Sequence, residues 1–426
     1  MKKILSLIAA ILIASAASAQ YRPRPDAFPP VEEDNAAKAI TMATTPAQMA
    51  NWDRYPTYST YVTMMQQWAT DYPTLCRLDT IGTSVNGRLI LSMELTANPG
   101  DTTLREFFYS STIHGDEVTG YVMMLRLIDT LLRGYGTNPQ YTTLMNTTLI
   151  CINPLANPDG TYRYSNNTVQ GARRYNANNI DLNRNYPNPF STAKEPEPLQ
   201  QENQAMIDYF NRHRFRLSAN LHGGSEVMNY PWDSFTSLQN PHPDAAWWQA
   251  VCHRFVDTSH TYNANHFNDV YEADNGVVAG GDWYVITGGR QDYFNYYYNC
   301  LELTMEISSD KTLSSNLLPT YWNFLQHPLV NYIGEIHSLP GDTILDTNLA
   351  ITATATKPAL VVYPNPATTT LHLSAAPATI DIYDIQGRLQ QTLPQGTTTV
   401  DVSRMPAGIY ILRCSGTNSK FIVRRQ

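Results

Sequence analysis

Hydrophobic positions alternate between two spacings from about residue 55 to residue 337. Apolar residues recur at helical spacing in four segments, at 58–72, 117–136, 200–214 and 245–260. Extended apolar runs lie between them and predict strands at 88–96, 106–113, 147–154, 216–222 and 299–307. Strands that alternate with helices predict an α/β domain, built on a mixed, largely parallel sheet flanked by helices.

The pattern changes near residue 338. A Thr/Ala-rich linker is predicted at 338–357. Short extended runs separated by turn residues follow, at 360–366, 370–374, 379–388, 398–403, 408–414 and 420–425. Regularly spaced short strands of this kind predict a small all-β sandwich over residues 358–426.

The N-terminus has a different pattern. Two lysines precede an apolar run from Ile4 to Ala16, and Ala17-Ser18-Ala19 follows it. The run is too short for a spanning helix. It predicts a Sec-type signal peptide over 1–19 and no transmembrane span in the mature chain. The Pro-, Ala- and Thr-rich residues 20–54 are predicted to be an N-terminal extension, and a propeptide role is left open.

Composition narrows the functional classes. A length of 426 residues favours two or three domains. The formal net charge of −8 argues against a nucleic-acid partner. The five cysteines contain no C-x-x-C pair, so a cysteine zinc site is not expected. An exported chain could form one or two disulfides, whose pairing stays open.

Candidate metal ligands follow the predicted strands. His114 and Glu117 come after one strand, His222 ends a second, and Glu306 lies at the end of a third. Open α/β sheets bind ligands beyond the carboxyl ends of their strands. Two histidines and one carboxylate would leave a zinc ion with an open position for water. A further carboxylate could take the proton of that water and pass it to a leaving amine.

A second candidate is the segment RRYNANNIDLNRNYP at 173–187, which is rich in Arg and Asn. It could be a solvated basic loop. It could instead be an anion clamp, with Arg184 in bidentate contact with a carboxylate. A zinc-bound water beside such a clamp indicates a peptidase that recognises a free C-terminus.

Six motifs occur in order: HGDE, NPDG, NANNIDLNRNYP, SANLHGGSEVMNYPWD, GGDWYVITGGRQDYFNY and NCLELTMEI. Together they resemble the zinc metallocarboxypeptidase family, in the regulatory branch that includes carboxypeptidases E, N, M and D. The resemblance covers about residues 55–337. It implies a carboxypeptidase-like catalytic domain with one zinc ion per chain, which hydrolyses the C-terminal residue of peptides and proteins.

The resemblance also implies roles by position. His114, Glu117 and His222 match the zinc ligands, and Glu306 matches the general base. Arg174 matches the arginine that polarises the scissile carbonyl and stabilises the oxyanion. The residues matched to substrate binding are Asn183 and Arg184 for the terminal carboxylate and Tyr284, which closes over bound substrate.

Specificity rests on fewer residues. Asp233 matches the acidic residue that pairs with a C-terminal Lys or Arg in this branch, and Gln291 matches its pocket partner. Arg290 stands where the branch usually has Met. If its side chain enters the pocket, it would oppose basic substrates, and if it points away, nothing changes. Glu302 shares a strand face with Glu306, and its role is left open.

The last segment resembles the C-terminal sorting domain of type IX secretion, through VVYPNP, IDIYDIQGR, MPAGIYILR and KFIVRR. That implies Sec export, recognition of residues 358–426 by outer-membrane secretion machinery, and a secreted or cell-surface protein. An accessory β-sandwich without a sorting role is the alternative.

Two other functions stay open for the whole chain: a peptidoglycan peptidase acting on diaminopimelate peptides, and a catalytically silent surface binding protein.

Overall fold

The chain forms two compact units, one ending at Asp342 and the other running from Thr343 to Gln426. The computed structural model describes residues 38–190, 198–268, 270, 273–340, 362–363, 366–373, 379–384, 388–414 and 417–425. The predicted signal peptide, residues 20–37 and most of the predicted linker lie outside the described residues. In the described part of the chain, no helix is both long and apolar enough to cross a membrane.

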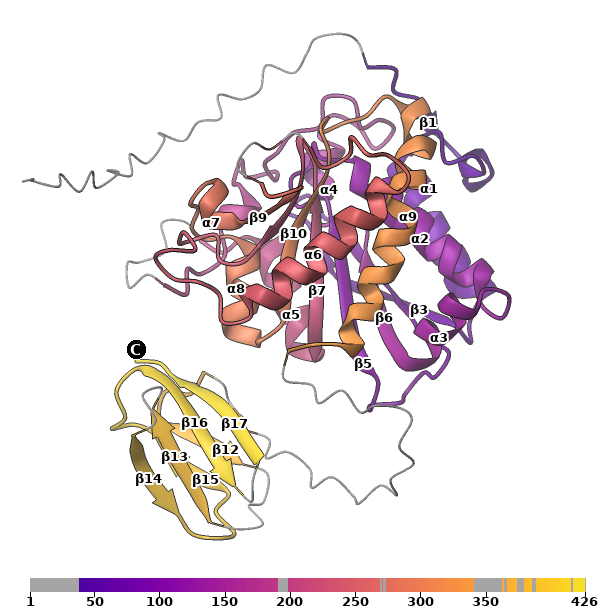
Figure 1. Cartoon of the computed structure of the whole chain (residues 1–426). Coiled ribbons are helices and arrows are strands. Elements are labelled where there is room, and N and C mark those ends of the chain that lie inside the picture. The colour runs from indigo at the N-terminus through magenta and orange to yellow at the C-terminus, as the bar shows by residue number, and fades with distance from the viewer. Residues whose placement is uncertain are drawn as a thin grey trace, which may run out of the picture. The chain divides into compact units, whose positions relative to one another are not determined.

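An eight-stranded sheet forms the centre of the first unit (Figure 1), and its strand order is β3-β4-β6-β5-β7-β10-β8-β9. Four neighbouring pairs are parallel and three are antiparallel. This arrangement confirms the prediction of a mixed, largely parallel sheet. The strands are β3 (Cys76–Thr83), β4 (Leu89–Leu95), β5 (Arg105–Ser111), β6 (Thr148–Asn153), β7 (Phe215–His222), β8 (Ser225–Tyr230), β9 (Val277–Ala279) and β10 (Leu301–Ser308).

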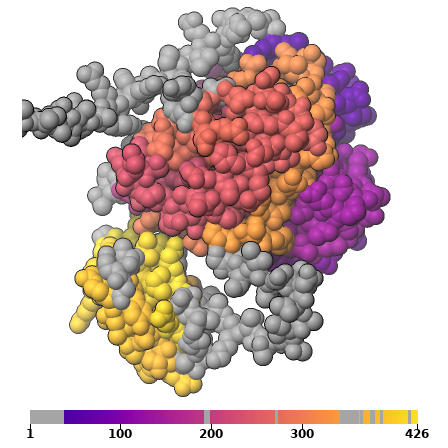
Figure 2. Space-filling view, in the orientation of Figure 1, coloured from indigo at the N-terminus to yellow at the C-terminus, as the bar shows by residue number. Residues whose placement is uncertain are grey.

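Alternation along the strands gives the sheet two apolar faces. On β5, Phe107 and Tyr109 join one hydrophobic core, whereas Phe108 joins the other. The first core is closed by α1 (Tyr58–Asp71), α2 (Thr119–Gly134), α3 (Pro139–Thr147), α6 (Ala245–His260) and α9 (Leu318–Gly334). The second is closed by α5 (Gln201–Arg212) and α8 (Arg290–Tyr298). Figure 2 shows the red surface of α6 beside the orange surface of α9.

Strands β7 and β10 depart from this apolar pattern on the side of α5 and α8. Their residues facing the first core are apolar, such as Leu221 and Met305. The alternate positions carry polar side chains in matched register: Ser218 beside Glu302, Asn220 beside Thr304, and His222 beside Glu306. We call these six residues the polar ladder. It ends at the carboxyl edge of the sheet.

Residues 38–56 pack against the rest of the first unit, although most of them fall in the predicted extension. The short strands β1 (Met42–Ala43) and β2 (Tyr55–Pro56) pair in parallel. The backbone N–H of Thr41 donates to Ser315 Oγ at 2.8 Å, and the hydroxyl of Tyr55 donates to the carbonyl of Leu313 at 3.0 Å. The N-terminal segment is therefore bound to the loop that follows β10.

The second unit consists of two antiparallel sheets, ordered β11-β12-β15 and β14-β13-β16-β17. Both sheets supply side chains to one core, for example Leu371 and Phe421, which confirms the predicted small β-sandwich. All five cysteines of the chain are buried free thiols. The strands are β11 (Val362–Tyr363), β12 (Thr370–Leu373), β13 (Ile380–Asp384), β14 (Leu389–Leu393), β15 (Thr399–Asp401), β16 (Gly408–Cys414) and β17 (Thr417–Val423).

Candidate metal centre and peptide-binding pocket

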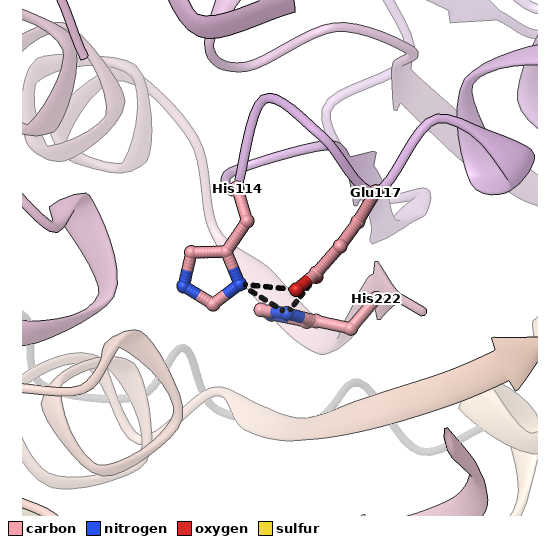
Figure 3. Close-up of side chains that lie close together, drawn as sticks. All are labelled: His114, Glu117 and His222. Atoms are coloured by element: carbon pink, nitrogen blue, oxygen red, sulfur yellow. Dashed lines mark hydrogen bonds and ion pairs between the residues drawn. The ribbon is translucent and has the colours of Figure 1, made fainter. Parts of the chain in front are cut away.

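Three predicted metal ligands meet at the carboxyl edge of the sheet (Figure 3). His114 and Glu117 come from the loop between β5 and α2, and His222 is the last residue of β7. His114 Nδ1 lies 2.9 Å from Glu117 Oε1, and His222 Nδ1 lies 2.8 Å from Glu117 Oε2. The two Nδ1 atoms are 3.1 Å apart, and all three residues are buried. The close approach of these atoms makes one compact group of donors for a metal.

The outer nitrogen of each histidine faces an acceptor. His114 Nε2 lies 3.2 Å from Asp181 Oδ1, and His222 Nε2 lies against Asn220 Oδ1. A proton on each Nε2 leaves the Nδ1 lone pairs pointing at each other and at a carboxylate. Burial lowers the pKa of His222 to about 4, which keeps its ring neutral near pH 7. Such a cluster of lone pairs fits a cation, and two histidines with one carboxylate are a zinc set.

Charged neighbours surround this group. Arg174 Nε donates to Asp181 Oδ2 at 2.8 Å, and its Nη1 lies 3.1 Å from His114 Nδ1. Lys311 Nζ lies 3.2 Å from Asp116 Oδ2 and 3.6 Å from Glu117 Oε1. Arg174 Nη1 also lies 3.7 Å from Glu117 Oε1, so two cations face this carboxylate and favour its ionised form. Glu117 is therefore ionised, as a metal ligand must be.

A single pocket joins this centre to most other residues predicted from the sequence. It is lined by His114, Arg174, Asn183, Arg184, His222, Asn229, Asp233, Tyr284, Ile286, Thr304 and Glu306. Of the predicted site residues, Glu117 and Gln291 are outside this lining but contact residues within it. Three lining residues, Asn229, Ile286 and Thr304, were not predicted. Only Thr304 had a usable signal, because it shares a strand face with Glu306.

The segment that carries Asn183 and Arg184 is a short turn. Asp181 caps 3-10 helix η2 (Leu182–Arg184) by accepting from the N–H of Asn183 at 2.9 Å. The backbone N–H of Arg290 donates to Asn183 Oδ1 at 2.9 Å. Asn183 and Arg184 both line the pocket, and with the Asn183 oxygen engaged, the polar groups left to them are N–H donors. These donors suit a carboxylate.

Asp233 lies in the pocket on the loop after β8. Gln291 Nε2 donates to Asp233 Oδ1 at 2.9 Å and to Asn229 Oδ1 at 3.1 Å. Burial raises the pKa of Asp233 well above its usual value, and the nearby Asp292 carboxylate raises it further. A Cβ on Gly280 would collide with the oxygens of Asp233 and Asn229, so glycine keeps this space open. The result is a cluster of acceptors that suits a cationic side chain.

Arg290 points away from this pocket. Its side chain is fully buried, and its Nε and Nη2 donate to Glu302 at 2.5 and 3.1 Å. Of the two orientations left open by the sequence, the structure therefore has the one in which Arg290 does not oppose a basic substrate. Tyr284 follows α7 (Gly280–Trp283) and lines the pocket, and the residue as a whole is 36% exposed.

Comparisons with known proteins agree with this geometry. The sequence model of the zinc carboxypeptidase family matches residues 61–327, and that of the secretion system C-terminal sorting domain matches 361–425. Carboxypeptidase D of Anas platyrhynchos is 35% identical over 295 residues, covering 67% of this chain and 21% of that protein. Carboxypeptidase M of Mus musculus is 33% identical over 288 residues, covering 63% of this chain and 62% of that protein. The chain thus spans about a fifth of carboxypeptidase D.

Solved structures share the fold. Thrombin activatable fibrinolysis inhibitor aligns with a TM-score of 0.58 at 16% identity, covering 69% of this chain and 77% of that one. Carboxypeptidase A from Helicoverpa armigera aligns with a TM-score of 0.54 at 18% identity, covering 66% and 75%. At this identity the likeness concerns the fold alone.

Proposed function

Because the chain belongs to the zinc carboxypeptidase family, we propose that its first unit removes the C-terminal residue from peptides and proteins, with a preference for lysine and arginine. One observation carries the proposal. A single pocket is lined by two metal-binding histidines, the carboxylate of Glu306, the Asn183–Arg184 pair and Asp233. The metal ligands, the base and the carboxylate clamp suit a zinc-dependent exopeptidase, and Asp233 adds a preference for a basic last residue.

The metal-binding end of the pocket provides the chemistry. His114, Glu117 and His222 would hold the zinc ion, which would supply the Lewis acidity needed to activate water and polarise a carbonyl. Glu306 lies beside His222 in the strand register and takes the proton of the attacking water. The same carboxyl group then protonates the leaving amine. Arg174 donates to the oxygen of the scissile carbonyl, where negative charge develops.

The remaining groups select the substrate. Asn183 and Arg184 bind the terminal carboxylate, which restricts cleavage to the last peptide bond. Tyr284 closes over the bound peptide from the rim. Asp233, supported by Gln291, pairs with the cationic end of a C-terminal lysine or arginine. An apolar side chain would leave this buried carboxylate without a charged partner, and discrimination follows from that difference.

Export follows from the second unit, which matches the secretion system C-terminal sorting domain. We infer that the chain crosses the inner membrane through its predicted signal peptide, and that residues 358–426 then direct it across the outer membrane. The test is the location of the full chain and of a chain ending at residue 342, both expressed in the cell of origin. The full chain is expected outside the cell or on its surface. Periplasmic retention of the full chain would contradict the sorting role.

Amino-acid release from peptides that differ only in the last residue tests the activity. We expect release of Lys and Arg that a zinc chelator stops. Chelator-sensitive release of apolar residues would keep the mechanism and remove Asp233 from specificity. Release from diaminopimelate-containing muropeptides alone would favour the peptidoglycan alternative. A purified protein that binds no zinc and cleaves no substrate would favour the silent binding protein.

A further inference from the structure

The polar ladder continues inward from the metal centre to a buried ion pair. Glu302 and Arg290 are fully buried, and Ser218 and Asn220 are almost fully buried. The guanidinium carbon of Arg290 lies 5.2 Å from the ring centre of Phe108 and 5.1 Å from that of Phe294. Burying charge among aromatic rings is costly unless the partners are well matched. The pair lies beside β7, the strand that ends at His222, and a costly feature at that place calls for a functional explanation.

The hydrogen bonds along the ladder have a fixed direction. Glu302 accepts from Ser218 Oγ at 2.7 Å, from Asn220 Nδ2 at 3.3 Å, and from two nitrogens of Arg290. Asn220 Nδ2 also donates to the carbonyl of Leu303 at 3.2 Å. An ionised carboxylate and a carbonyl can only accept, so Asn220 turns its NH2 group toward Glu302 and Leu303. Its oxygen then faces His222 and accepts the Nε2 proton. The lone pair of His222 Nδ1 is thereby left for the metal.

We propose that Arg290, Glu302 and Asn220 are positioning residues that fix the tautomer and the ring orientation of His222 for zinc. Arg290 keeps Glu302 an acceptor, Glu302 and the carbonyl of Leu303 orient the amide of Asn220, and Asn220 orients His222. None of the three touches the substrate. The inference rests on the metal centre of the proposed peptidase, and it gives a role to an arginine that stands outside the pocket.

The test is the double variant Arg290→Met/Glu302→Gln. It removes both charges together, so no unpaired ion is left in the core. A glutamine can donate as well as accept, so the Asn220 amide loses one of the acceptors that orient it, while the carbonyl of Leu303 remains. Zinc affinity, measured by competition with a chromophoric chelator, is expected to weaken by about tenfold or more. In zinc-free protein, the ring nitrogen signals of His222 by NMR are expected to change from the Nε2–H tautomer to a mixture.

Glu226→Gln is the matched control. Glu226 is a buried carboxylate on β8, and it accepts from Ser309, Phe267 and Tyr321. Its replacement changes a buried charge in the same sheet without altering the Asn220–His222 contact. Zinc affinity within about twofold of wild type is expected for this variant. Thermal unfolding of each zinc-free protein measures stability separately.

Two outcomes would overturn the proposal. One is a folded double variant with wild-type zinc affinity and an unchanged His222 tautomer. The other is an equal loss of zinc affinity in Glu226→Gln, which would indicate a general effect on the sheet. If the double variant does not fold, Asn220→Leu has a similar side-chain size, removes the acceptor of His222 Nε2 without leaving an unpaired charge, and carries the same expectation. A wild-type protein that binds zinc but cleaves no peptide would overturn the peptidase and leave this inference standing.

Discussion

The metal centre and the Asp233 pocket are two ends of one cavity, and both present buried oxygen or nitrogen lone pairs to a cation. They differ in how the charge is held. At the metal centre, the cations Arg174 and Lys311 lie near Glu117 and favour its ionised form. In the pocket, burial and Asp292 favour the protonated form of Asp233. The metal centre therefore has a permanent charge, whereas the charge of the pocket depends on pH and on the arriving side chain.

Of the variants that separate the metal centre from the Asp233 pocket, Glu306→Gln is expected to have the largest effect on activity. The amide cannot take a proton from water, so kcat should fall by about 10²–10⁴-fold for every substrate. Zinc binding should be retained, because Glu306 is not one of the three converging ligands. Steady-state kinetics and metal analysis of the same preparation measure both quantities. A loss of zinc along with activity would mean that Glu306 belongs to the metal centre itself.

Asp233→Asn should change the substrate preference, because Asp233 lies in the pocket and not at the metal centre. Removing the pocket charge is expected to lower kcat/KM for peptides ending in Lys by about 100-fold. Peptides ending in Leu should change little, and zinc affinity should stay at the wild-type value. The ratio of kcat/KM for the two peptides is the measurement. An unchanged ratio would assign specificity to other residues.

Asp181→Asn should change zinc binding and leave the substrate preference unchanged, the opposite of Asp233→Asn. The size of the effect should also be smaller. Asp181 accepts from His114 Nε2 and also pairs with Arg174. Its loss is expected to weaken zinc binding by about tenfold. The preference for Lys over Leu should be unchanged at saturating zinc. If the preference changes as well, the two ends of the cavity are not independent.

The smallest expected effect is the pH dependence of the preference. Asp233 is neutral below its raised pKa and charged above it, so the preference for Lys over Leu should decline by a few-fold as pH falls through that value. Both peptides share the titrations of the metal centre, which cancel in the ratio. The measurement is kcat/KM for both peptides across pH. Asp233→Asn should give a flat ratio, and a wild-type ratio that is also flat would contradict the conditional charge.

Sequence and structure agree best where the signal is local. The predicted helix at 245–260 and the strand at 216–222 match α6 and β7 closely. The strand β8 was not predicted, because it is buried on both faces and lacks alternation. Helix α9 was not predicted either, and it carries Pro328 within its span, which sequence rules treat as a helix breaker.

The same distinction applies to the candidate site. Motif spacing indicated His114 and Glu117, which are close in sequence. The orientation of Arg290 could not be derived, because its partner Glu302 is buried with it only after α8 packs on β10. Asn229 lines the pocket from the strand that was not predicted. The roles of the substrate-binding residues stay predictions until the variants are measured.

The attachment of residues 38–56 sets a limit on N-terminal trimming. Lys38 pairs with Asp310 at 3.1 Å, and Thr41 and Tyr55 bind the same loop, which carries Lys311 beside Glu117. A protease that cuts ahead of Lys38 removes nothing that these contacts need. A cut between Thr41 and Tyr55 would free one side of the loop next to a zinc ligand. N-terminal cleavage can therefore extend to about residue 38 before it removes contacts that hold the loop beside Glu117.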